Sequence, residues 1–159
     1  MPATDAFANI AHLSVTESAA NTLTFNQLQT GTAIFEKMAM IIHRIEYSPS
    51  FATINLLQSN IDDINIAWTT SDQITAIGKQ SAQVIDAINL NVLTVPVGNM
   101  YTRPLVSDFS TLPSGGLIVP ATSLFLAIQG TSVASPGFSR STIYFTYKSL
   151  KGEEFWELV

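Results

Sequence analysis

The chain has 159 residues, of which 47% are hydrophobic and only 12% charged, so it is long enough to fold around one core as a single domain. Its formal net charge of −5 and its seven scattered Lys and Arg residues argue against a surface that binds polyphosphate. Cysteine is absent, which excludes disulfides and thiolate metal sites. We expect no membrane span and no secretory signal, because no apolar run approaches the ~20 residues of a spanning helix and the N-terminus lacks a basic segment before an apolar one.

The charged fraction is about half of the ~25% that is typical of globular proteins. Two explanations fit such a chain. Its surface is covered by uncharged polar side chains, which are abundant here, or much of it is buried against other subunits. The second explanation bears on function, because the interfaces of obligate oligomers are depleted in charge.

Residues 1–20 are small and polar, with isolated apolar residues at Phe7, Ile10 and Leu13. This composition predicts a flexible N-terminal arm that is disordered, or ordered only against a neighbour. The remaining residues, 21–159, are then expected to form one β-sandwich domain.

The first segments of that domain predict strands, with one ambiguity. Alternating apolar residues predict a strand over residues 21–29. Residues 33–42 fit either a helix, with apolar residues three or four apart, or one face of a strand, and both alternatives stay open. The following Ile-Ile-His-Arg-Ile-Glu-Tyr run is rich in β-branched residues, so we favour a strand over Met40–Tyr47.

The middle of the chain predicts strands around one short helix. Residues 61–69 alternate and predict a strand. The apolar spacing that follows suits a short amphipathic helix over residues 81–87 and then a strand over residues 90–97. Two Gly-containing turns and two prolines predict a long irregular loop over residues 98–116.

The last third carries the clearest pattern. Residues 117–119 and 124–129 are short apolar runs of strand length, and residues 142–148 alternate strictly between apolar and polar side chains. Residues 152–159 predict a short amphipathic helical tail. Seven to eight short strands separated by loops of Gly, Pro, Ser and Asn imply an all-β fold, an antiparallel sandwich or barrel.

Histidine offers little for catalysis, because the chain has only two and one of them lies in the expected arm. His43 would act as a general base only with a carboxylate brought from elsewhere in the fold. We favour the plainer interpretation, a strand whose polar face carries an Arg44–Glu46 pair. The chain also lacks a Gly-x-Ser-x-Gly motif, so we do not expect an enzyme.

Metal and cofactor motifs are also weak. Asp62 and Asp63, joined by Asp72 or Asp86, offer oxygen ligands for calcium. No Asp-x-Asp-x-Asp-Gly loop is present, so a solvated turn is the plainer interpretation, and an ion site at Asp62 and Asp63 stays an open alternative. Gly115-Gly116 is not followed by the Lys-Ser or Lys-Thr of a phosphate-binding loop, so we expect no cofactor.

Four aromatic residues, Trp68, Tyr101, Tyr144 and Trp156, have the ring faces that stack on sugars. Aromatic residues of this kind more often belong to a core or an interface, which is the interpretation we favour for them. The sugar-binding alternative requires that at least Trp68 or Tyr101 be solvent-accessible.

Two segments stand out: residues 112–132 (LPSGGLIVPATSLFLAIQGTS) and residues 140–159 (RSTIYFTYKSLKGEEFWELV). With residues 42–47 (IHRIEY) and 69–73 (TTSDQ), they resemble small viral coat proteins of the single jelly-roll kind. The resemblance covers the C-terminal third and implies a single jelly roll of about eight strands. Many such proteins carry a basic N-terminal arm, whereas residues 1–20 have no Lys or Arg, so we expect no strong nucleic-acid binding by the arm.

The resemblance implies a structural capsid protein of the virion that self-assembles into an icosahedral shell. Its partners would be copies of the same chain, with other virion proteins as further candidates. An alternative from a different class is a monomeric β-sandwich that binds carbohydrate or another ligand. The candidate interface residues are apolar or aromatic: Phe7, Ile10, Leu13, Tyr101, Phe155 and Trp156.

Overall fold

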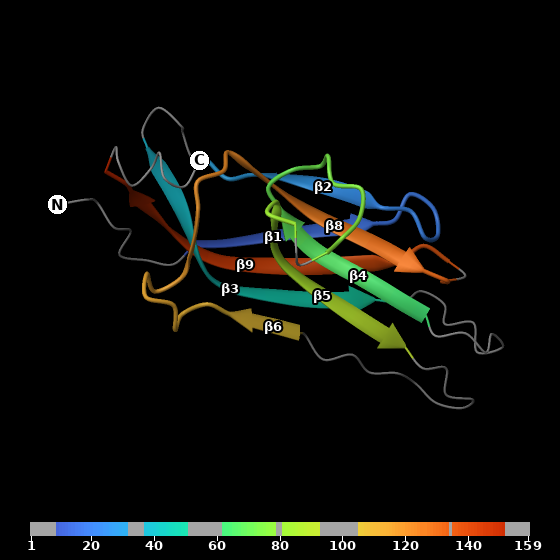
Figure 1. The fold of residues 1–159 in the computed structure, drawn as a ribbon. Coiled ribbons are helices and arrows are strands. Elements are labelled where there is room, and N and C mark those ends of the chain that lie inside the picture. Colours follow the sequence, from blue (N-terminus) through green and yellow to red (C-terminus); the bar gives the residue numbers. More distant parts are fainter. Residues whose placement is uncertain are drawn as a thin grey trace.

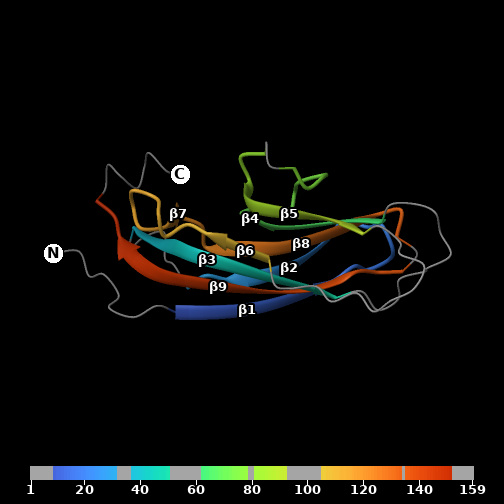
Figure 2. The same cartoon turned by 90° about the horizontal axis from the view of Figure 1, so that it is seen from below.

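A computed structural model of the chain describes residues 9–31, 37–50, 62–78, 81–92, 105–133 and 135–151. Nine β-strands and no helix lie in this described part (Figure 1). They form two antiparallel sheets that stack as a sandwich (Figure 2). The strands are β1 (Asn9–Thr16), β2 (Thr24–Gln29), β3 (Met38–Ser50), β4 (Asp62–Thr69), β5 (Val84–Val92), β6 (Leu105–Asp108), β7 (Leu117–Val119), β8 (Ser123–Thr131) and β9 (Phe138–Ser149).

The strands pair in a nested order. Sheet I has the order β1-β9-β3-β6, with β7 also paired to β3, and sheet II has the order β2-β8-β4-β5. Within them β1 pairs with β9, β2 with β8, β3 with β6, and β4 with β5. Strands from opposite ends of the chain are therefore neighbours, and successive pairs alternate between sheet I and sheet II.

The core lies between the two sheets and follows from the alternation of side chains along each strand. Its largest members come from β3 and β9 of sheet I and from β4 and β8 of sheet II, and Val15 of β1 and Val119 of β7 are also buried in it. Burying each large apolar side chain contributes roughly 1.5–3 kcal/mol to folding. The largest fully buried side chains are Trp68, Tyr47, Met40, Ile42, Ile45, Ile64, Ile66, Leu124, Leu126, Ile128 and Ile143.

A β-bulge at His43 explains the ambiguous pattern of β3. The pairing register with β9 shifts between Ile42 and Arg44, so that His43 is the extra residue. Because of this insertion Ile42 and Ile45, three residues apart, both face the core. A spacing of three is what makes the segment look helical in sequence, yet it is a strand from Met38 onward.

Polar side chains connect the two sheets inside the sandwich. The Tyr47 hydroxyl of β3 and the Ser107 hydroxyl of β6 both donate to Oδ2 of Asp86 on β5, at 2.8 and 2.6 Å. The indole Nε1 of Trp68 donates to the Ser141 hydroxyl across the core at 2.8 Å. Burial, reinforced by the facing charge of Asp86, raises the pKa of Tyr47 well above its ordinary value.

Glu17, which follows β1, holds the loop between β8 and β9. Its carboxylate is only 3% exposed and accepts hydrogen bonds from the backbone N–H groups of Gly130 and Gly137, at 2.5 and 2.7 Å. The Asn21 side chain binds the same loop, accepting from the N–H of Val133 at 2.8 Å and donating to its carbonyl at 3.0 Å. These four hydrogen bonds fix the loop against the turn between β1 and β2.

The all-β, antiparallel sandwich expected from the sequence is confirmed. Strands occur where alternation predicts them, although their ends differ by a few residues. The expected strands over residues 21–29, 61–69, 117–119, 124–129 and 142–148 correspond to β2, β4, β7, β8 and β9.

The short helix expected over residues 81–87 is wrong, because β5 occupies most of this segment and pairs with β4. A register shift between β4 and β5 makes Ile85 an extra residue, so that Ile85 and Ile88 both pack against the core. Their spacing of three imitates one face of a helix, as in β3.

Other expected boundaries also change. The long loop expected over residues 98–116 contains β6, and the arm expected over residues 1–20 contains β1, which pairs along its whole length with β9. Of the strand expected over residues 90–97, the described part is the end of β5. The predictions for residues 33–36 and for the helical tail over residues 152–159 lie outside the described residues.

Candidate functional site

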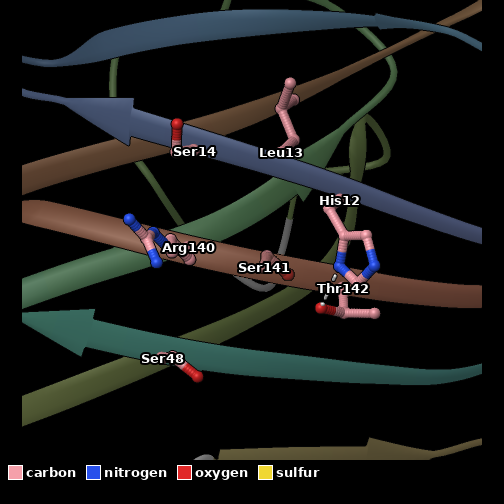
Figure 3. A pocket seen from close by; sticks show the side chains of 7 residues that line it. All are labelled: His12, Leu13, Ser14, Ser48, Arg140, Ser141 and Thr142. Atoms are coloured by element: carbon pink, nitrogen blue, oxygen red, sulfur yellow. Dashed lines mark hydrogen bonds between the residues drawn. The ribbon is translucent and has the colours of Figure 1, made fainter.

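A shallow depression lies on the outer face of sheet I, where β1, β9 and β3 run side by side. The pairing register places Ser14, Arg140 and Ser48 in one row across these three strands, with His12 beside Thr142 two residues along. Alternation turns these side chains away from the core. The depression has a volume of about 520 Å³ and is lined by His12, Leu13, Ser14, Ser48, Arg140, Ser141 and Thr142 (Figure 3).

Two side chains of the depression are already bonded to neighbours. Nδ1 of His12 lies 2.9 Å from the hydroxyl of Thr142, as the dashed line in Figure 3 marks. The exposed guanidinium of Arg140 lies 5.6 Å from the centroid of the Phe138 ring, which is the geometry of a cation–π contact. This contact places the guanidinium beside the Phe138 ring while Arg140 remains an exposed residue.

The depression contains one guanidinium, that of Arg140, which has no ion-pair partner among the described residues. No carboxylate of the described residues lies within 4.0 Å of the Arg140 guanidinium. Glu46 sits opposite Thr142, but its Oε1 is turned to the guanidinium of Arg44, at 2.5 Å. Within this part of sheet I, Glu46 is therefore paired with Arg44 rather than with Arg140.

Around Arg44, on the same face of sheet I, positive and negative charges balance. The Arg44 guanidinium lies 5.5 Å from the centroid of the Tyr144 ring, and Asp108 of β6 is its register partner. Hydrogen bonds from Ser110 hold the pKa of Asp108 below its ordinary value, and the charge of Arg44 lowers it further. Arg44 thus has two acidic neighbours, Glu46 and Asp108, whereas Arg140 forms no ion pair with the described residues.

His43, the candidate general base, has a structural role at the bulge. Nδ1 lies 2.7 Å from the carbonyl of Gly115, and Nε2 lies 2.9 Å from the hydroxyl of Thr146. Because a carbonyl only accepts, Nδ1 is the nitrogen that carries the proton. Both ring nitrogens are used to hold the loop before β7 against β9. The structure does place Arg44 and Glu46 together, as expected from their positions in the sequence.

The aspartates considered for calcium are not brought together. Asp86 is turned inward to Tyr47, Asp72 is exposed in the turn after β4, and Asp63 lies toward the other end of that strand. One buried oxygen of Asp63, Oδ1, has no hydrogen-bond partner among the described residues. Within those residues no group of three His, Cys, Asp or Glu side chains converges to hold a metal ion.

A second concavity, of about 580 Å³, is mostly apolar. It separates the start of β5 in sheet II from β7 in sheet I, at one side of the sandwich. Its lining offers contact area rather than acid–base or nucleophilic groups. The lining residues are Thr70, Ala82, Val84, Ile85, Leu117, Ile118, Val119, Pro120 and Ala121.

Of the four aromatic residues considered for sugar stacking, the structure describes Trp68 and Tyr144. Trp68 is fully buried and its indole N–H is bonded inside the core, so the sugar-stacking interpretation of this residue is wrong. Tyr144 is half-buried, with Arg44 over its ring. Tyr101 and Trp156 lie outside the described residues.

Of the candidate interface residues, Ile10 is 55% exposed on the edge strand β1, whereas Leu13 packs against the core from the same strand. Their role in an interface stays a prediction. The other four candidates, Phe7, Tyr101, Phe155 and Trp156, lie outside the described residues.

Sequence reasoning missed several surface features. Val106 is 49% exposed on β6, a strand of four residues that is too short for alternation to be recognised. Leu112 is also exposed, in the turn that follows. His12 and Arg140 lie in one depression because β1 pairs with β9, and no local sequence pattern predicts that pairing.

Neither the protein-family models nor the curated proteins contain a match to this chain. Among the described residues, no helix has the length and apolarity needed to cross a membrane.

Proposed function

We propose that this chain folds as a single jelly roll and is a structural protein of a virion, which assembles with its own copies into a closed capsid. The role is architectural rather than catalytic. The observation that carries the proposal is the nested order of strand pairs in the two sheets.

A jelly roll is a long antiparallel ribbon of two strands that is wrapped around a core. Such wrapping pairs the outermost strands first and the innermost strands last, and it alternates the pairs between two four-stranded sheets. The pairs β1–β9, β2–β8, β3–β6 and β4–β5 follow this order, with β7 as a short addition beside β3. The strand order therefore supports the jelly roll that the sequence resemblance implies.

Jelly rolls serve in viral capsids, and also in lectins and cupins, so the fold alone leaves the role undecided. The edges of sheet I favour assembly. Ile10 on β1 and Val106 on β6 are large apolar side chains exposed on the two edge strands. An edge strand also presents backbone groups that invite pairing with another chain. Contacts between copies of this chain would cover both features.

The proposal is tested by light scattering coupled to size-exclusion chromatography, with electron microscopy of the purified chain. We expect closed particles of uniform size. Soluble monomers at high concentration, with no particles under any salt condition, would contradict the proposal and favour the alternative of a lone binding module.

The edge contacts are tested by Ile10→Asp and Val106→Asp. A charge buried without a partner in an interface is costly, so we expect each variant to lower the yield of particles about tenfold or more. Thr16→Asp is the matched control, because Thr16 is an exposed residue of β1 on the same face as Ile10. Circular dichroism checks that the variants fold. An equal loss of particles in Thr16→Asp would contradict a contact centred on Ile10.

A further inference from the structure

The depression on sheet I has groups that are available for a ligand. The guanidinium of Arg140 and the hydroxyls of Ser14 and Ser48 make no hydrogen bond to the described part of the chain. In the adjacent row, the Thr142 hydroxyl and the His12 ring are bonded to each other, and His12 keeps its second nitrogen. One cation is thus surrounded by neutral hydrogen-bonding groups on three strands.

The spacing of these groups sets the size of the ligand. Rows of side chains on one face of a strand are about 6.6 Å apart, and β1 and β3 on either side of β9 are separated by about 9.6 Å. Polar groups distributed over such an area match the ring of one monosaccharide with its substituents. A shallow and open site of this kind suits a sugar unit of a glycan better than a ligand that must be enclosed.

The charge sets the chemistry of the ligand. A guanidinium offers two parallel N–H donors to a carboxylate or sulfate. Its interaction with a ligand anion is strongest where no Asp or Glu side chain of the protein competes for the same donors. No carboxylate of the described residues lies within 4.0 Å of the Arg140 guanidinium, whereas Arg44 on the same face is already bound to Glu46. Serine and threonine hydroxyls both donate and accept, as sugar hydroxyls do.

We propose that this depression binds an acidic sugar, with its carboxylate or sulfate on Arg140 and its hydroxyls on Ser14, Ser48 and the His12–Thr142 row. The site is formed within one chain, so the inference does not depend on assembly into a shell. For a shell protein, such a site gives the particle a means of attaching to acidic glycans.

The test uses saturation-transfer NMR titrations of the full-length chain, a method that works for free chains and for large particles. The probes are glucuronic acid, glucose, and inorganic sulfate. Glucuronic acid and glucose differ in the carboxylate alone, so we expect saturable binding of glucuronic acid, with a dissociation constant on the order of millimolar, and about tenfold weaker binding of glucose.

The decisive variant is Arg140→Gln, which we expect to weaken glucuronic acid binding about tenfold. Lys148→Gln is the matched control, because it removes the same charge from the same face of β9 outside the depression. Ser14→Ala combined with Ser48→Ala is expected to weaken binding several-fold without changing net charge.

Three outcomes would overturn the proposal. Equal binding by the Arg140→Gln and Lys148→Gln variants would reduce the interaction to general attraction between charges. Equal affinity for glucose would remove the role of the carboxylate. Sulfate binding as tight as that of glucuronic acid, insensitive to the two serine substitutions, would show an anion site that does not recognise sugars.

Discussion

Glu17 and Arg140 are charged residues placed in opposite ways in the same sandwich. Glu17 is buried, and both of its carboxylate oxygens accept backbone hydrogen bonds. Its carboxylate therefore stabilises the loop between β8 and β9. Arg140 is exposed on an open face, and its guanidinium makes no hydrogen bond to the described residues. The comparison separates a charge that stabilises the fold from a charge that is free to bind a ligand.

The largest expected effect on stability comes from Glu17→Ala. It leaves two buried N–H groups without acceptors, so we expect a loss of about 2–4 kcal/mol in the free energy of unfolding. Arg140→Ala removes an exposed charge and should change stability by about 0.5 kcal/mol or less. Urea unfolding at equal protein concentration, followed by tryptophan fluorescence, measures both. Similar losses in the two variants would contradict the distinction between these charges.

A smaller effect, at the same loop, is expected for Gly130→Ala. A Cβ at this position would lie 2.5 Å from Cγ2 of Val133 and 3.2 Å from both carboxylate oxygens of Glu17. Relieving this overlap should cost about 1–3 kcal/mol of stability. Gly78→Ala is the control, because no atom of the described residues lies within 4 Å of the position that its Cβ would take. A neutral Gly130→Ala would mean that the loop is held less tightly than its hydrogen bonds suggest.

The smallest effect at neutral pH is expected for Tyr47→Phe, which extends the comparison to a buried group that is uncharged. Losing the hydrogen bond to Asp86 should cost about 1 kcal/mol, and Ser107 continues to donate to that carboxylate.

The pH dependence of this variant gives the sharper test. Because the pKa of Tyr47 is raised in the folded state, the unfolded chain ionises first, and the stabilisation is present below about pH 10 and is lost as the pH rises above it. The difference in unfolding free energy between the original chain and Tyr47→Phe should therefore shrink between about pH 8 and pH 11. A difference that is constant over this range would contradict the raised pKa.

Much of the fold follows from the sequence, because alternation is read directly from strands such as β9 and β4. The one incorrect helix, over residues 81–87, and the one ambiguous segment, at the start of β3, both lie at irregularities in strand pairing. Bulges place Ile42 with Ile45, and Ile85 with Ile88, on the core side at a spacing of three. A spacing of three is also the helical spacing, so only the pairing of β3 and β5 with their neighbours decides between the two structures.

The depression and the Glu17 contact could not be predicted in the same way. Glu17 and its partners Gly130 and Gly137 are more than a hundred residues apart in the chain, as are His12 and Arg140. Neither the Glu17 contact nor the depression has a local sequence motif. Both form only because β1 is part of sheet I. Assigning residues 1–20 to an arm therefore concealed both features at once.

The nested pairing also orders events during synthesis on the ribosome. β9 is an inner strand of sheet I, flanked by β1 and β3, yet it is translated after both of them. Until it emerges, β1 has no neighbour in its sheet, and such distant pairing is slow to form. A nascent chain therefore cannot complete sheet I until β9 has been made, and under the proposed assembly contacts between copies would follow only after that point.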